Sequence, residues 1–145
     1  MPTRRNAVSA LYTPHMLALS AQLSLYPWSD GFAYQSDGRS SVCGSTMTMG
    51  LNLDASEAVE DAGLKITACA VGQSSAAIFA SAARGANAAM IAATLEGLNR
   101  WLDGEGDLPE WPQLDVIAGV RGHPGRYGAL LLPWKTALAA LPPAT

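Results

Sequence analysis

The sequence predicts an α+β fold in which a three-stranded antiparallel sheet packs against several helices. Apolar and polar residues alternate cleanly across the second half of residues 40–54, which is typical of a strand with one buried face. Weaker alternation precedes this strand at residues 32–35 and follows it at residues 64–69. The short connections between the three segments favour an antiparallel meander, and helical patterns flank them on both sides.

Composition limits the domain count and the class of protein. A chain of 145 residues, 49% apolar and 14% charged, is most simply one globular domain spanning residues 1–145. A net charge of −3 without long charge runs argues against nucleic-acid binding. No apolar stretch is long enough for a membrane span or a signal-peptide core, so we expect no membrane partner and a cytoplasmic location.

The segments before the long central strand contain a helix, a strand and a turn. Thr13 and Pro14 suit the cap and the first position of a helix that runs to about Leu25. The first strand should cover residues 32–35, and Asp37-Gly38 is a turn signal that should end it.

The second half of the chain is predicted to be helical. Ser74 and Ser75 are suitable caps for a helix over residues 76–83, with Gly85 just beyond its end. Three further helical segments are residues 88–102 after the cap Asn87, a short helix over 114–120, and an apolar segment over 124–141 that Pro133 would kink or interrupt.

The two cysteines are the residues with the most distinctive chemistry. Cys69 ends the third predicted strand just before a helix, where the helix N-terminus favours a thiolate that can act as a nucleophile or a metal ligand. Cys69 could equally be a small buried hydrophobic residue. Cys43 stands at the opening of the second strand. Antiparallel pairing of the second and third strands would bring both thiols to one end of the sheet.

Catalytic signatures are absent from the sequence. It contains no GxSxG, HExxH, Walker A or GxGxxG motif. His15 and His123 fit surface positions, and the adjacent Glu60 and Asp61 fit the solvated edge of a strand. We therefore do not expect an enzyme. The remaining alternative with chemistry of its own is a thiol enzyme or redox switch that uses Cys43 and Cys69.

Six short motifs follow one another along nearly the whole chain. They are Tyr12-Thr13-Pro14-His15, Cys43-Gly44, Val59-Glu60-Asp61-Ala62, the segment 68–76 (ACAVGQSSA), the segment 119–126 (GVRGHPGR) and the segment 134–138 (WKTAL). Their order and spacing resemble the U-type iron–sulfur cluster assembly scaffold family, which comprises the NifU N-terminal-like, IscU and SufU proteins. The last two motifs and the connector before them resemble the SufU branch in particular.

The resemblance implies a SufE/NifU-like fold, with a three-stranded antiparallel sheet against helices. It also implies a site of three cysteines and an aspartate that holds a nascent iron–sulfur cluster or a zinc ion. Matched position by position, the first and second cysteines are Cys43 and Cys69, which become the expected cofactor and metal ligands. Ser45 stands at the aspartate position, and Ala129 stands at the third cysteine, three residues after Arg126. The ligand set is therefore incomplete.

Two hypotheses follow from the resemblance. In the first, the protein is scaffold-like and uses its two cysteines to accept sulfur from a cysteine desulfurase-type donor, or to share a cluster or metal ion across a homodimer. Metal binding by one chain should then be weak, with water or His123 completing the site, and the two thiols could also form a disulfide. In the second, the protein is a cluster-free pseudo-scaffold that acts as a protein–protein interaction module in the same pathway.

Overall fold

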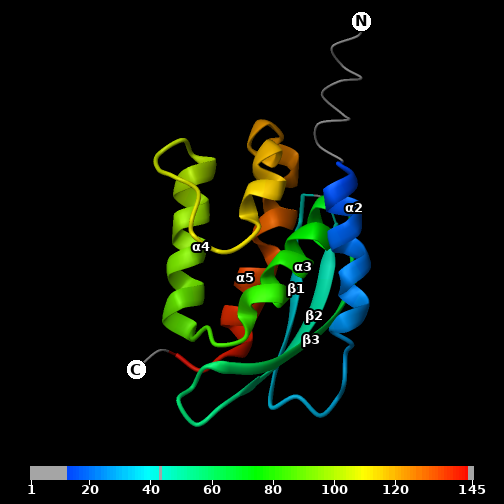
Figure 1. Ribbon diagram of the computed structural model, residues 1–145, viewed down its shortest axis with the longest axis vertical. Coiled ribbons are helices and arrows are strands. Elements are labelled where there is room, and N and C mark those ends of the chain that lie inside the picture. The colour runs from blue at the N-terminus through cyan, green and yellow to red at the C-terminus, as the bar shows by residue number, and fades with distance from the viewer. Residues whose placement is uncertain (1–12, 43, 144–145) are drawn as a thin grey trace, which may run out of the picture.

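The structure, a computed structural model, describes residues 13–42 and 44–143. It contains a three-stranded antiparallel sheet in the order β1-β2-β3, with helices packed against it (Figure 1). The strands are β1 (Tyr34–Arg39), β2 (Thr46–Leu53) and β3 (Val59–Thr67). Helix α5 (Tyr127–Ala140) contacts β1 and β2, and helix α3 (Ala70–Ala83) contacts β3. The predicted fold class, α+β with helices against a three-stranded antiparallel meander, is confirmed.

Strand β2 follows the predicted alternation. Met47, Met49 and Leu51 are buried in the core beneath the helices, whereas Thr46 and Thr48 on the other face are partly exposed. A one-residue shift in pairing would reverse these faces, so the hydrophobic pattern fixes the register.

Strand β1 differs from the prediction. It begins at Tyr34 and continues to Arg39 through Asp37-Gly38, which was predicted to be a turn. A Cβ atom built on Gly38 would lie 2.0 Å from Thr136 Oγ1 of α5. Glycine is therefore needed at this position because helix and strand approach closely, and the turn prediction was wrong.

The first described helix, α2 (Pro14–Ala21), is as predicted. The Thr13 hydroxyl accepts a hydrogen bond from the backbone N–H of Met16 (3.2 Å), and Pro14 occupies the first turn. A short 3₁₀ helix, η1 (Gln22–Leu25), extends it to the predicted end.

Helix α3 begins earlier than predicted. Its first residue is Ala70, so Ser74 and Ser75 lie inside the helix and are not caps. Both serines are fully buried. The Ser75 hydroxyl donates to the Leu130 carbonyl of α5 (2.5 Å), and the Ser74 hydroxyl lies within hydrogen-bond distance of the Ala70 carbonyl of its own helix (2.8 Å) and of the Met16 carbonyl of α2 (3.1 Å). Hydrogen bonds inside the assembled core therefore satisfy the hydroxyls of Ser74 and Ser75, which the sequence pattern had suggested as helix caps.

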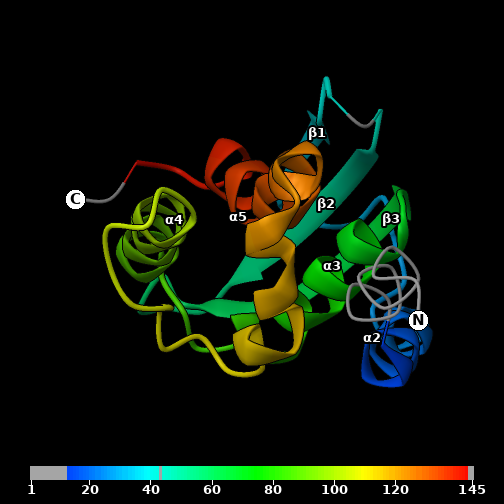
Figure 2. The same ribbon diagram turned by 90° about the horizontal axis from the view of Figure 1, so that it is seen from above.

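The remaining helices confirm most of the prediction. Helix α4 (Ala88–Leu102) follows its cap Asn87, and the predicted short helix is the 3₁₀ helix η2 (Leu114–Gly122). A second short 3₁₀ helix, η3 (Pro124–Arg126), leads into α5. Helix α5 runs through Pro133 without interruption, contrary to one predicted outcome, and Pro133 is buried. Figure 2 shows α2 and α4 on opposite sides of the molecule, with α3 and α5 between them.

An aromatic cluster fills the core between the helices. Phe79 stacks on Trp111 with ring centroids 5.3 Å apart, and Trp134 meets both rings edge-on at 5.5 Å. The Trp111 indole N–H donates to the Ile78 carbonyl (3.0 Å), which satisfies its polar group inside the core. None of the helices in the described ranges has the length and apolarity that a bilayer crossing requires.

Candidate functional site

Cys69 occupies the N-cap position of α3. Its backbone is extended (φ −68°, ψ 174°), and its thiol is free, partly exposed and makes no capping hydrogen bond. The Cys69 carbonyl accepts the backbone N–H of Gln73 (2.9 Å), and the Gln73 side-chain amide donates to the Ala68 carbonyl (2.9 Å). The backbone around Cys69 is therefore held on both sides, and the residue is partly exposed while also packing against the edge of the hydrophobic core.

The loop that joins β1 to β2 leaves the sheet at the same end. Thr46 pairs with Thr67 across β2 and β3, so the start of β2 lies beside the end of β3 that leads to Cys69. The loop is closed by the backbone N–H of Ser40, which donates to the Ser45 carbonyl (2.8 Å). Cys43 falls in this loop but lies outside the described residues. Its predicted proximity to Cys69 therefore stays a prediction.

Ser45 and Ala129, the two positions at which the resemblance predicts missing ligands, lie close to the first turn of α3. A Cβ atom built on Gly72 would be 3.7 Å from Ser45 Oγ and 3.6 Å from Ala129 Cβ. Both residues are buried, with 2% and 0% of their surface exposed. The end of the β1–β2 loop, the first turn of α5 and the first turn of α3 thus meet three residues after Cys69.

This convergence was predicted only through the family resemblance. The contribution of Gly72 was missed, because an isolated glycine near a helix start carries no specific signal of close packing. Helical residue Gly128 behaves in the same way, since a Cβ atom there would lie 2.3 Å from Ser40 Oγ in the loop. Glycines on both helices therefore allow the loop and the two helix starts to approach closely.

The histidines and the acidic strand-edge residue that the sequence analysis considered lie at or near the surface. His15 and Glu60 are exposed, and His123 is partly exposed between η2 and η3. Within residues 13–42 and 44–143, no group of three or more His, Cys, Asp or Glu residues is placed to hold a metal ion.

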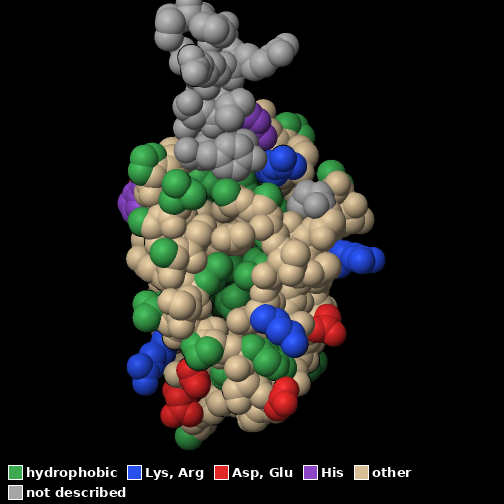
Figure 3. Space-filling view, turned by 90° about the vertical axis from the view of Figure 1, so that its right-hand side faces the viewer, with side chains coloured by type: hydrophobic (Ala, Val, Ile, Leu, Met, Phe, Trp, Pro, Cys, Tyr) green, Lys and Arg blue, Asp and Glu red, His purple; other side chains and the backbone are tan. Residues whose placement is uncertain are grey.

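The charges visible on one face of the molecule differ between its two ends. On the face drawn in Figure 3, acidic side chains lie only toward the lower end. The upper end, where α2 and α3 begin, shows histidine and basic side chains but no acidic one.

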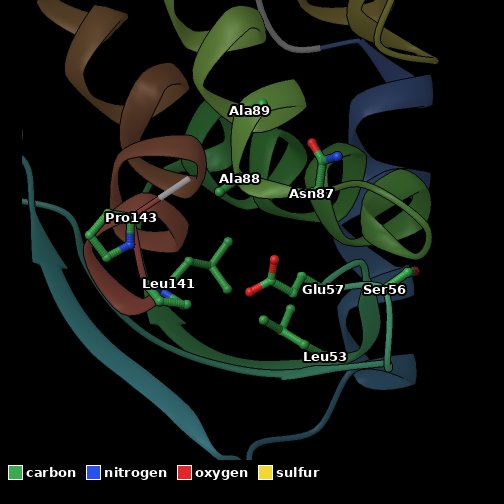
Figure 4. Close-up of a pocket in the computed structure, with 9 residues that line it drawn as sticks. Leu53, Ser56, Glu57, Asn87, Ala88, Ala89, Leu141 and Pro143 are labelled. Atoms are coloured by element: carbon green, nitrogen blue, oxygen red, sulfur yellow. The ribbon is translucent and has the colours of Figure 1, made fainter. Parts of the chain in front are cut away.

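A cavity of about 110 Å³ lies at the other end of the molecule (Figure 4). The β2–β3 turn, the start of α4 and the segment after α5 form its walls, and neither Cys nor His lines it. The Glu57 side chain points into this cavity beside Ala88 and Leu141. This cavity is therefore separate from the end of the sheet that carries Cys69.

Comparison with solved structures places the fold among known proteins. A crystal structure of a nitrogen-fixing NifU-like protein (N-terminal) from Brucella abortus superimposes with a TM-score of 0.84 and 24% identity, covering 92% of this chain and 94% of that chain. The chain has the NifU-like fold. An iron–sulfur cluster assembly scaffold protein for the SUF system from Fervidobacterium islandicum AW-1 matches with a TM-score of 0.78 and 20% identity, covering 91% and 97% of the two chains.

A third structure, of a hypothetical protein, shares the NifU-like fold at a TM-score of 0.64 and 17% identity over 87% of this chain. No family model and no curated protein matches the sequence. The predicted resemblance to the U-type scaffold proteins is thus confirmed through the fold.

Proposed function

We propose that this protein serves iron–sulfur cluster assembly as a scaffold-type protein, with Cys69 as its principal sulfur-accepting thiol and Cys43 as the second. The observation that carries the proposal is the position of Cys69, partly exposed at the N-cap of α3 in a NifU-like fold. The two neighbours named above are described as a NifU-like protein and as a cluster assembly scaffold, and these descriptions support a role in iron–sulfur cluster assembly.

The chemistry requires a thiolate that a donor protein can reach. The Cys69 thiolate attacks the terminal sulfur of a persulfide on a cysteine desulfurase-type donor. The sulfur–sulfur bond of the donor breaks, the donor cysteine leaves as a thiolate, and Cys69 carries the new persulfide. No net oxidation or reduction occurs, so no further reactant is needed. Cys69 stands at the N-cap of α3, and helix N-termini in general favour anionic groups.

Cluster cargo would need more thiolates than one chain provides. Iron–sulfur clusters are commonly held by four cysteine thiolates. Cys43 and Cys69 supply two per chain, so a homodimer would supply four. We therefore propose that a cluster or zinc ion is held only transiently by one chain, or is shared between two. The protein would act in the cytoplasm as a stoichiometric carrier, not as an enzyme.

Sulfur uptake tests this function. The protein is incubated anaerobically with a cysteine desulfurase and free cysteine, and the intact mass is measured. We expect a gain of one sulfur atom per chain that is lost in Cys69→Ser, reduced in Cys43→Ser and retained in the control Glu96→Gln, an exposed residue of α4.

Uptake that persists in the Cys43→Ser, Cys69→Ser double variant would contradict the proposal. A stoichiometric complex with the desulfurase that transfers no sulfur to the wild-type protein would instead favour the cluster-free interaction module.

A further inference from the structure

Ligand-type side chains are too few at any one place in this chain for a four-coordinate metal site. No three His, Cys, Asp or Glu residues gather suitably within the described ranges. Residues 1–12 and 144–145 contain none of these types, and position 43 adds a single cysteine. One chain therefore brings at most three such ligands together, whereas structural zinc sites and iron–sulfur clusters typically take four protein ligands.

Close packing occupies the place of the missing ligands. Ala129 is fully buried and Ser45 nearly so, and both lie against the backbone of α3 at Gly72. A Cβ atom on Gly72 would be only 2.7 Å from Ala68 Cβ, closer than two carbon atoms can pack. Only glycine therefore fits at position 72, and two small buried residues, Ser45 and Ala129, lie beside it at the positions where the resemblance places ligands.

Hydrogen bonds from the second turn of α3 hold the same junction. The Ser75 hydroxyl donates to the carbonyl of Leu130, the residue after Ala129. The neighbouring Ser74 hydroxyl is shared between the Ala70 carbonyl of its own helix (2.8 Å) and the Met16 carbonyl of α2 (3.1 Å). These buried bonds join α3 to α5 and α2 directly, and a buried hydrogen bond of this kind contributes about 1 kcal/mol to stability.

We infer that a single chain folds without a metal ion and, also without one, holds in place the end of the sheet where β3 leads into Cys69 and α3. The packing of Ser45 and Ala129 against Gly72, with the Ser75–Leu130 hydrogen bond, joins the loop, α3 and α5 as ligands to a common ion would. Metal is then not part of the folded single chain, and its thiols remain available to a sulfur donor. This inference concerns the stability of the site and does not depend on sulfur uptake.

Thermal unfolding with and without a chelator tests the inference. Excess Zn²⁺ or EDTA is added to freshly prepared, reduced protein, and metal content is measured in parallel. A metal that binds the native state raises the melting temperature by mass action. We expect the same melting temperature in EDTA as in untreated protein, and purified monomer without stoichiometric zinc or iron. We also expect Ser75→Ala to lower the melting temperature equally with and without the chelator.

A melting temperature that falls in EDTA, or one bound metal ion per chain that is lost in Cys69→Ser, would overturn the inference. If Cys69 still accepted sulfur, the proposed function would stand while this inference failed.

A gain-of-ligand variant provides the converse test. Ser45→Asp combined with Ala129→Cys restores the two donors at the places where the structure has packing. We expect this variant to bind one Zn²⁺ per chain, with a melting temperature that EDTA lowers, and to lose both properties when Cys69→Ser is added. A folded double variant that takes up no Zn²⁺ would contradict the assignment of Ser45 and Ala129 as substitutes for ligands, and the wild-type measurement remains decisive if the variant does not fold.

Discussion

Gly38→Ala should be among the most damaging single-methyl additions to the sheet. The new Cβ atom would lie 2.0 Å from Thr136 Oγ1 and 3.1 Å from Leu132 Cδ1 on α5. Thr136 is buried, and its hydroxyl donates to the Leu132 carbonyl (2.7 Å), so it cannot rotate away without losing that bond. Overpacking costs about 1–3 kcal/mol and a lost buried hydrogen bond about 1 kcal/mol, so the free energy of unfolding should fall by about 2–4 kcal/mol.

Urea denaturation followed by tryptophan fluorescence measures this loss, and a double-mutant cycle identifies its cause. Thr136→Ala removes the clashing oxygen, so the double variant Gly38→Ala, Thr136→Ala should be less destabilised than the sum of the single variants. Gly106→Ala is the matched control because a Cβ atom there meets nothing within 4 Å. A Gly38→Ala protein as stable as this control, or strictly additive effects, would refute the packing of β1 against α5 described above.

Three further predictions concern other parts of the fold. Gly63→Ala should reduce stability more than Gly38→Ala, because its Cβ atom would lie 2.3 Å from the Pro27 backbone carbonyl oxygen, which cannot rotate away; equal or smaller loss in urea denaturation would contradict this. Asn87→Ala should cost about 1 kcal/mol through loss of the α4 cap, also measured in urea. Hydrogen bonds from the Ser56 hydroxyl and from the backbone N–H groups of residues 58 and 56 hold the pKa of Asp54 below the ordinary value of an aspartate side chain. The resulting stabilisation is present above that ordinary pKa and is lost as pH falls through the lowered pKa, so Asp54→Asn should flatten the acid limb of the stability profile, and an unchanged limb would count against it.

Elements whose determinants are local could be predicted from the sequence. The alternation in β2 and the cap of α4 at Asn87 depend on residues within a few positions, and both are confirmed. Asp37-Gly38 was misinterpreted because the same dipeptide is a common turn signal, and its true constraint comes from Thr136, nearly a hundred positions away. Local patterns carry no information about such a contact.

The candidate site, like the fold, combines features that local sequence predicts with features that depend on distant contacts. Cys69 was correctly expected just before a helix, but the start of α3 was placed too late because Ser74 and Ser75 resemble caps. The Ser75 hydroxyl instead donates to Leu130 of α5, and the Ser74 hydroxyl reaches Met16 of α2 as well as Ala70 of its own helix. The contacts with other helices appear only in the assembled fold. The meeting of Ser45 with Ala129 came from the family resemblance, since residues 84 positions apart share no periodicity.

The most direct test of the account is to locate transferred sulfur at the level of peptides while a chelator is present. Wild-type protein is loaded by a cysteine desulfurase in EDTA, its persulfides are trapped by alkylation, and the digest is analysed by mass spectrometry. The account predicts a persulfide on the peptide that contains Cys69, with no requirement for added metal. Cys69 that remains an unmodified thiol, or that gains sulfur only when Zn²⁺ or iron is supplied, would contradict it.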